Sequence, residues 1–358
     1  YPHGHGQLTN KGKQRVYELG IYIREQYGQF LGNIYYPKVV FARSTYYDRT
    51  KMSLQLVMAG IFPPALEQKW NLELNWQPVV VNYVPPGNDS LMLFYRFSKF
   101  KEEYDTVKRL PGVRKEIEKF SDFGKNLSEW TGASITDIEH FNFIYHSLAS
   151  LHSMELDLPT WTSGIFPHGA LLNATVLDYR LLNYNRKLRC LSGGDYRKIM
   201  NTDYVHFFQY LHSIIHVKSF RNSKLNFPHD FLYDHKEDCL LLLISGVILK
   251  KFIDNMLAVA KKDGDSEFKM ELLGGHDLNI VSMLKILDVY QAHVPEYSSA
   301  IFVELLADND RYFVNIHYYL GMPPIRTSIE IPGCGELWPL GTFVKLFNDS
   351  LPTAENIC

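Results

Sequence analysis

Residues 268–287, FKMELLGGHDLNIVSMLKIL, decide how this chain folds. An apolar stretch runs into Gly274 and Gly275, His276 and Asp277 follow side by side, and apolar residues then recur at helical spacing. This pattern is typical of a buried strand that passes through a tight turn into a helix. Two titratable side chains therefore stand at the carboxyl end of a strand, which is where open α/β sheets bind their ligands.

A second strand-to-helix unit lies nearer the N-terminus. Residues 35–43 are rich in aromatic and β-branched side chains, which predicts a short buried strand ending near Arg43. We expect the next helix to begin at Ser44 or Thr45 and to end near Gly60. Arg43 thus occupies the same place on its strand as the histidine–aspartate pair does on the other.

The remaining pattern predicts an α/β domain that is interrupted once. Further expected elements are a helix over 9–31 with Thr9 as its N-cap, a strand within 76–86, a helix over 244–262, and an antiparallel hairpin of 299–308 with 311–321. From about Leu91 to Asp178 amphipathic helical segments dominate. The fold we expect is a three-layer α/β sandwich with an inserted helical cap domain. Its parts are an α/β portion over 1–92, the cap over 93–180, and a second α/β portion over 181–358.

Composition excludes several classes of protein. The chain has 358 residues, 46% of them hydrophobic, which is enough for a sizeable core, and its net charge of −2 gives no indication of a nucleic acid partner. The longest apolar run, residues 239–249, is too short to span a bilayer. The four cysteines form no CxxC pair, which excludes a zinc ribbon or a thioredoxin motif. Sequons compatible with secretion and N-glycosylation begin at Asn88, Asn126, Asn173 and Asn348.

The residue types at the two strand ends suit phosphate chemistry. The guanidinium of Arg43 offers a planar fork of donors for phosphate oxygens, and the neighbouring helix start adds free N–H groups. A histidine can donate to a phosphoryl oxygen, and a protonated aspartic acid can deliver a proton to a leaving group. The structural alternatives are a surface ion pair for Arg43 and a helix cap beside an exposed histidine for His276 and Asp277. For Arg49 we expect a structural pairing with Asp48 or another nearby acid.

In combination, five stretches resemble the histidine acid phosphatases, in the group that includes prostatic, lysosomal and insect venom acid phosphatases. GHGQLTNKG resembles the GxGQLTxxG segment of that family, and ARSTYYDRTKMS resembles its RSTxxDRTxxS motif. LPTW at Leu158, GGHDLNI at Gly274 and IPGC at Ile331 follow in the same order. The resemblance covers most of the chain, and the insect venom members look most similar.

The resemblance implies hydrolysis of small phosphomonoesters through a phosphohistidine, without a metal or a cofactor. Arg43 matches a phosphate-binding arginine of the family, His276 its second active-site histidine, and Asp277 its proton donor. It also implies a secreted or lysosomal protein. A homodimer is left open.

The sequence departs from the family at its nucleophile. The family places the nucleophilic histidine and two phosphate-binding arginines in an RHGxRxP motif that precedes GxGQLT. No RHG occurs anywhere in this sequence, so we expect an N-terminally incomplete chain rather than a lost nucleophile. Without that histidine, covalent catalysis of this type cannot proceed.

Smaller departures concern the turn and the cysteines. Leu278 and Asn279 stand where the family has two threonines, which puts the local hydrogen bonding in doubt. Two family cysteines are replaced, near Phe97 and at Trp338, which leaves Cys334 and Cys358 to pair with each other as an alternative.

About fifty residues, near 190–240, have no clear family counterpart. The stretch is either a genuine insertion or a gene-model artefact. We expect Cys190 and Cys239, which bracket it, to form a disulfide in an oxidising compartment. His212 and His216 are four residues apart and could share a helix face as metal ligands, but with no third ligand evident we prefer a packing role.

Three functions fit the sequence. The leading one is an acid phosphatase, although the 358 residues alone are expected to be inactive. The second is a catalytically inactive homologue that binds a phosphorylated ligand or a partner. The third is a phytase or phosphoglycerate-mutase relative with a narrower substrate, which the His–Asp chemistry does not separate from the first.

Overall fold

The structure of this chain is a computed structural model. It describes residues 4, 6–191, 216–220, 247–261, 268–321, 323, 325–329 and 337–348. The helices are α1 (Asn10–Leu31), α2 (Asp48–Ile61), α3 (Ser98–Lys108), α4 (Pro111–Glu118), α5 (Ser121–Thr131), α6 (Ile138–Ser153), α7 (Ala170–Leu181), α8 (Arg186–Leu191), α11 (Val247–Ala260), α12 (Asp277–Ile286) and α13 (Leu340–Asn348). Short 3₁₀ turns are η1 (Leu66–Gln68), η2 (Phe94–Arg96) and η3 (Thr160–Thr162). The strands are β1 (Val40–Ser44), β2 (Asn82–Tyr83), β3 (His216–Phe220), β4 (Met270–Gly274), β5 (Ala300–Asp308), β6 (Arg311–Leu320), β7 (Ile325–Ser328) and β8 (Leu337–Pro339).

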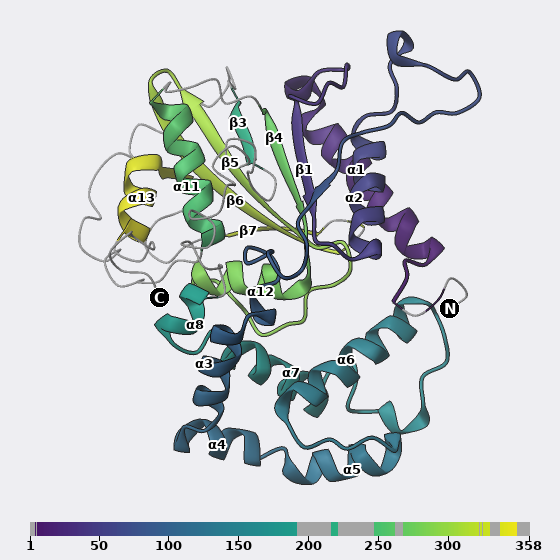
Figure 1. Ribbon diagram of the computed structural model, residues 1–358, viewed down its shortest axis with the longest axis vertical. Coiled ribbons are helices and arrows are strands. Elements are labelled where there is room, and N and C mark those ends of the chain that lie inside the picture. The colour runs from purple at the N-terminus through teal and green to yellow at the C-terminus, as the bar shows by residue number, and fades with distance from the viewer. Residues whose placement is uncertain are drawn as a thin grey trace.

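The strands form two adjoining sheets. In the first, β1 lies between β2 and β4, and all three run parallel. In the second, β3 pairs parallel with β5, whereas β6 pairs antiparallel with β5, β7 and β8. Strand β3 also lies beside β4, which brings the two sheets together in Figure 1. The unmatched stretch of the sequence therefore contributes a strand to the centre of the molecule.

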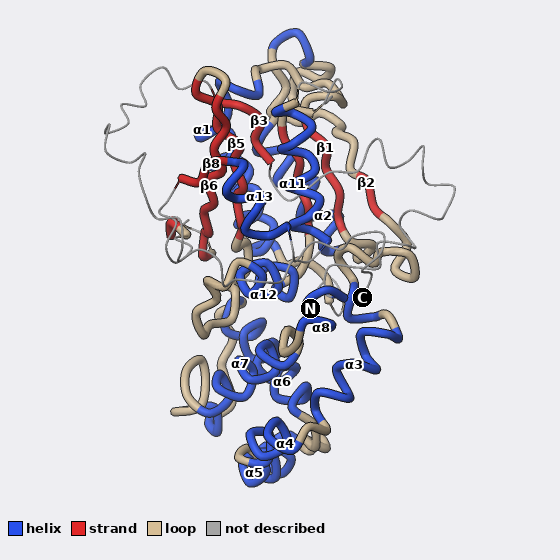
Figure 2. The backbone as a smooth tube through the Cα atoms, turned by 90° about the vertical axis from the view of Figure 1, so that its left-hand side faces the viewer, coloured by secondary structure: helices blue, strands red, loops and turns tan. Residues whose placement is uncertain are grey.

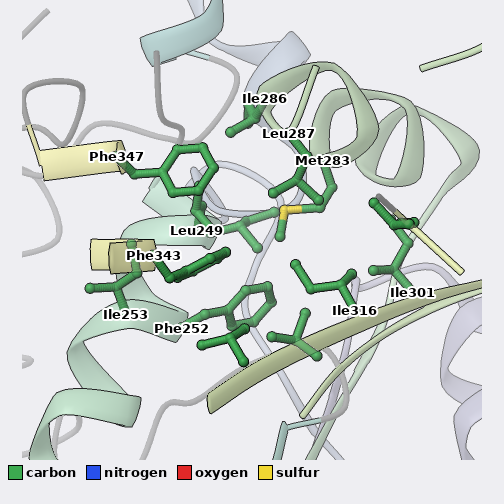
Figure 3. Packing of buried hydrophobic residues seen from close by; sticks show 14 of the residues in the cluster. Leu249, Phe252, Ile253, Met283, Ile286, Leu287, Ile301, Ile316, Phe343 and Phe347 are labelled. Atoms are coloured by element: carbon green, nitrogen blue, oxygen red, sulfur yellow. The ribbon is translucent and has the colours of Figure 1, made fainter. Parts of the chain in front are cut away.

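Helices cover both faces of the strands, which makes the three-layer α/β sandwich that the sequence predicts. Strand β5 shows this most clearly, because successive side chains of a strand point to opposite faces. Phe302 packs into the core under α1 and α2, whereas Ile301 and Val303 pack into the core under α11, α12 and α13. In Figure 3, Phe252 of α11, Met283 of α12 and Phe343 of α13 lie together in that second core.

Helices α1 and α2 pack unusually closely because two glycines meet there. A Cβ atom on Gly20 would lie 2.2 Å from the carbonyl oxygen of Val57, and one on Gly60 would lie 2.6 Å from that of Tyr17. Gly60 lies near the end of α2, as expected, and the helix ends one residue later at Ile61. Gly60 also lets the backbones of the two helices approach.

The helical segment forms a separate block below the sheets in Figures 1 and 2. Helices α3 to α8 share a core of their own that runs from Phe94 to Leu191. Val281 of α12 also belongs to this core, so the helix that follows the histidine–aspartate pair lies between the block and the sheets. We call this block the cap, and its extent as a domain over 93–180 stays a prediction.

Most expected elements are confirmed, and two differ. Helix α1 begins after Thr9, whose side chain accepts a hydrogen bond from the N–H of Gly12, as predicted. Helix α2 begins at Asp48, three residues or more later than expected, because Ser44 still belongs to β1 and the N–H of Thr45 donates to the carbonyl oxygen of Gly274 at 3.0 Å.

The strand expected within 76–86 is reduced to Asn82–Tyr83. Pro78 has no N–H to donate to a ladder. The N–H of Val80 donates to the hydroxyl of Tyr35 at 3.0 Å, and the Gln77 amide donates to the carbonyl oxygen of Phe62 at 3.2 Å. Side-chain hydrogen bonds therefore hold this segment where a sheet ladder was expected.

Candidate active site

The turn between β4 and α12 is held by Asn279. His276 has extended backbone angles, φ −127° and ψ 165°, and immediately precedes the helix. Its N–H donates to Oδ1 of Asn279 at 2.8 Å, and the amide of Asn279 donates to the carbonyl oxygen of Met92 at 3.0 Å. Asn279, which stands where the family has a threonine, thus supplies the hydrogen bonds of this turn.

Only one of the two glycine positions in this turn has no room for a side chain. A Cβ atom on Gly275 would lie 2.6 Å from Oδ1 of Asn279, closer than real contacts allow. A Cβ atom on Gly274 would make ordinary contacts of 3.5 Å with the side chains of Leu54 and Ser44. Gly275 is therefore needed so that the asparagine can reach the backbone of His276.

The imidazole of His276 is enclosed by aromatic rings and faces a threonine. Its Nε2 lies 3.1 Å from Oγ1 of Thr45, and the rings of Tyr47 and Tyr95 contact it edge-on at centroid distances of 5.4 and 6.4 Å. Burial, together with the charge of Arg49, lowers the pKa of His276 to about 4. The imidazole is therefore neutral near pH 5, and it can donate a hydrogen bond from one ring nitrogen only.

Two side chains of the cap contact the carboxylate of Asp277. Its Oδ2 accepts a hydrogen bond from the hydroxyl of Tyr179 and lies 3.3 Å from Nε2 of His146. Burial alone would raise the pKa of Asp277, but hydrogen bonds from His146 and Tyr179 and the neighbouring His276 outweigh it and lower the pKa to about 2. Without a ligand, Asp277 is thus a carboxylate at any ordinary acidic pH.

Arg43 forms a buried ion pair, not the surface pair that is usual at a strand end. Its Nη2 lies 2.5 Å from Oδ1 of Asp89, and the two side chains are 5% and 0% exposed. Burial lowers the pKa of Arg43 and raises that of Asp89, and the attraction between the two opposes both shifts. Nε of Arg43 is buried and has no hydrogen-bond partner among the described residues.

One loop connects Arg43 with His276. Arg43 is opposite Leu273 in the register of β1 and β4, three residues before His276. The N–H of Met92 donates to Oδ1 of Asp89, the partner of Arg43, at 3.1 Å. Since the carbonyl oxygen of Met92 accepts from the asparagine of the turn, residues 89–92 tie the two strand ends together. That all three predicted side chains reach one phosphate stays a prediction.

Several residues at the site were not predicted from the sequence. Asp89, Tyr95, His146 and Tyr179 lie far from the motifs along the chain, and no local pattern marks them. The RST stretch contained a usable signal for Thr45, because its hydroxyl follows the strand exit directly. Asp48, one partner expected for Arg49, pairs instead with Lys51 at 2.9 Å, and the Arg49 guanidinium lies over the ring of Tyr47, 4.7 Å from its centre.

Some expectations fall outside the described residues. Cys239, Cys334, Cys358 and His212 are among those not described, so neither expected disulfide and no paired-histidine site is tested. Within the described ranges, no three His, Cys, Asp or Glu side chains are placed to hold a metal ion. No helix in those ranges is long and apolar enough to cross a membrane.

The fold and the site together define an α/β protein in which a parallel strand edge faces a helical cap. The histidine phosphatase superfamily (branch 2) matches residues 1–133. Venom acid phosphatase Acph-1 of Apis mellifera is 36% identical over 357 residues, which cover 100% of this chain and 79% of the relative. Prostatic acid phosphatase of Homo sapiens is 27% identical over 355 residues, which cover 98% and 78%. The chain belongs to the histidine phosphatase superfamily (branch 2).

Solved structures support the same fold. Hafnia alvei phytase in complex with tartrate superposes with a TM-score of 0.56 at 14% identity, covering 100% of this chain and 91% of that one. Klebsiella phytase superposes with a TM-score of 0.54 at 15% identity, covering 99% and 88%. At such low identity the likeness concerns the fold alone.

Proposed function

We propose that this site hydrolyses small phosphomonoesters, with Arg43 and His276 binding the phosphoryl group and Asp277 handling the proton of the departing alcohol. The observation that carries this proposal is the placement of all three residues at the carboxyl ends of the parallel strands β1 and β4, joined by residues 89–92. The Arg43 donor that has no partner within the described part of the chain and a neutral imidazole are both suited to phosphoryl oxygens.

The low pKa of Asp277 makes the substrate the source of the proton. A phosphomonoester loses its second proton near pH 6, so at pH 5 most of it carries one. Bringing a phosphoryl group next to Asp277 adds negative charge and raises the pKa of the carboxyl. The ester's proton can then move to Asp277 and from there to the leaving oxygen. Acidic pH thus favours turnover by keeping the substrate protonated.

The covalent route through a phosphohistidine needs a nucleophile in an RHGxRxP motif, which residues 1–358 do not contain. The test is hydrolysis of an aryl phosphate near pH 5 by this chain and by a version that carries an added N-terminal strand with RHGxRxP. We expect activity only in the second. Full activity in the unextended chain would show that the nucleophile is elsewhere.

The alternative function is binding of a phosphorylated ligand without turnover. The same unpaired donor on Arg43 favours it, since anion binding needs no nucleophile. Calorimetric titration with inorganic phosphate separates the two functions. Binding that Arg43→Ala abolishes, together with no turnover by the extended version, would support the alternative.

We also propose a secreted or lysosomal protein, following the venom, prostatic and lysosomal names of its relatives. The sequon residues Asn88, Asn126 and Asn173 are exposed, as glycosylated positions must be. Treatment of the secreted protein with a peptide N-glycosidase should lower its mass. An unchanged mass would contradict glycosylation.

For a homodimer, the candidate surface is the extended arm of residues 63–81. Leu66 and Leu72 are 86% and 85% exposed there, and Trp70 is 59% exposed, next to the edge strand β2. Exposed apolar side chains gathered on one segment favour an interface. Leu72→Glu should turn a dimer into a monomer in analytical ultracentrifugation, and a wild-type monomer would rule the interface out.

A further inference from the structure

We infer that His146 and Tyr179 are positioning residues through which the cap holds Asp277 for proton transfer. This inference rests on the proposed function. Both residues come from the cap, His146 from α6 and Tyr179 from α7, whereas Asp277 opens α12 beside the sheet. The contacts join three elements around one carboxylate.

The hydrogen-bond directions in this cluster are fixed by chemistry. An ionised carboxylate can only accept, so the single hydroxyl proton of Tyr179 goes to Oδ2 of Asp277. Nε2 of His146 lies 2.9 Å from the Tyr179 oxygen, which must then accept from it. His146 therefore carries its proton on Nε2 and points that proton at both Tyr179 and Asp277.

Both contacts fall on the same oxygen of Asp277. Oδ2 faces the tyrosine and the histidine, which leaves Oδ1 as the oxygen to exchange a proton with the substrate. Tyr179 is 0% exposed, so its ring is locked by packing and its hydroxyl needs this partner. A side chain held by a rigid neighbour keeps the orientation that proton transfer requires.

The other titratable groups near Asp277 do not compete for this role. Tyr95 of η2 and Tyr290, which follows α12, both have pKa values raised by burial and by the charge of Asp277, so both keep their protons. His276 directly precedes Asp277 in the chain, and its imidazole is neutral above its pKa of about 4. Tyr179 and His146 are thus the donors that hold Oδ2 of Asp277.

The cap offers a matched control. Tyr104 donates to the buried carboxylate of Asp178, and Asn142, one turn before His146 on α6, donates to its other oxygen at 2.8 Å. This second cluster has the same chemistry, a tyrosine and an α6 residue on one aspartate. It lies inside the cap, where Asp178 immediately precedes Tyr179 in the chain, and no contact of Tyr104 or Asn142 with Asp277 is found among the described residues.

A titration tests the contacts without requiring activity. The pKa of Asp277 can be followed by carboxyl ¹³C NMR in this chain, comparing Tyr179→Phe and His146→Ala with Tyr104→Phe. Removing donors from a carboxylate raises its pKa, so the first two variants should titrate above the wild-type value of about 2 and the third should not. Identical titration in all of them would overturn the inference.

Kinetics test the role in proton transfer, using the version that carries RHGxRxP. Tyr179→Phe should lower kcat for an alkyl phosphate by about ten- to a hundredfold, with little change in KM and a smaller loss for an aryl phosphate. His146→Gln keeps an N–H donor and should retain more activity than His146→Ala, while Tyr104→Phe should leave the alkyl-to-aryl ratio unchanged. An unchanged ratio in Tyr179→Phe overturns the role. If the unmutated version with RHGxRxP hydrolyses neither substrate, the proposed function fails. The titration alone then decides whether His146 and Tyr179 control the pKa of Asp277.

Discussion

Arg43 and Asp89 form an ion pair whose two side chains are almost completely buried, between a strand end and the loop that leads to the cap. A buried pair of this kind leaves an uncompensated charge when one partner is removed. Two features of the site therefore depend on Asp89: the stability of the sheet edge and the negative charge beside Arg43.

Asp89→Ala should lower the free energy of unfolding by about 3–5 kcal/mol. Inorganic phosphate should restore part of that loss, because the anion supplies the negative charge next to Arg43. Urea unfolding with and without phosphate measures both effects. As a control, Asp48→Ala breaks the exposed pair with Lys51 and should cost less than about 1 kcal/mol. No phosphate effect in Asp89→Ala would argue against Arg43 as the anion ligand.

His276 should make the chain less stable as pH falls from about 6.5 to 4. Its folded pKa of about 4 lies below the unfolded value of about 6.5, so the unfolded state binds the extra proton in this window. His276→Gln should therefore flatten the stability profile between these pH values. Urea midpoints measured across the window test this, and equal slopes in both proteins would show that the histidine is not shielded.

Asp277 should act at lower pH and in the same sense, with stability falling as pH falls. Its folded pKa of about 2 lies below the unfolded value of about 3.9, so its stabilising contribution is complete above about pH 4 and is lost as pH falls towards 2. Asp277→Asn should be less stable than the wild type at pH 6, and the difference should shrink in acid. A constant difference down to pH 2 would show that the carboxylate is not held by its cap partners.

The two glycines of the turn should respond differently to an added methyl group. Gly275→Ala forces Asn279 away from the His276 backbone and should cost about 1–3 kcal/mol, whereas Gly274→Ala meets only ordinary contacts. Adding Asn279→Ala to the Gly275 variant should recover little stability if the lost hydrogen bond matters, and most of it if only the clash does. Thermal unfolding of the three variants decides.

Asp277→Asn should slow turnover about a hundredfold or more in the version that carries RHGxRxP, the usual scale for a general acid. An aryl leaving group needs less protonation, so the loss should be larger for an alkyl phosphate. Steady-state rates for both substrates near pH 5 test this. Equal losses would indicate that Asp277 serves binding rather than proton transfer.

Sequence reasoning succeeded wherever a local pattern determines the structure. Thr9 caps α1, β1 ends at Ser44 and β4 at Gly274, close to where the apolar runs stop, and the hairpin of β5 and β6 turns between Asp308 and Arg311. In each case the spacing of apolar residues and the turn chemistry act over only a few residues. The motif residues of the site lie at these same positions.

Sequence reasoning failed where contacts link distant parts of the chain. Tyr179 and His146 meet Asp277 about a hundred residues or more away in sequence, and nothing in the periodicity of α6 or α7 indicates a polar partner. The same holds for β3, which comes from a stretch that showed no family counterpart yet pairs with β5. A single sequence contains no signal for such pairings until the fold brings the elements together.

The register of β1 with β4 also has a consequence for how the molecule assembles. Val40 pairs with Met270, and the whole cap lies between them along the chain. Contacts between residues so far apart in sequence form slowly, whereas the cap helices meet through neighbouring segments. The cap should therefore become ordered first, and the sheet should close around it. Asp277 would then reach Tyr179 only in the last stage of folding. A complete site would therefore exist only in chains in which β1 and β4 have already paired.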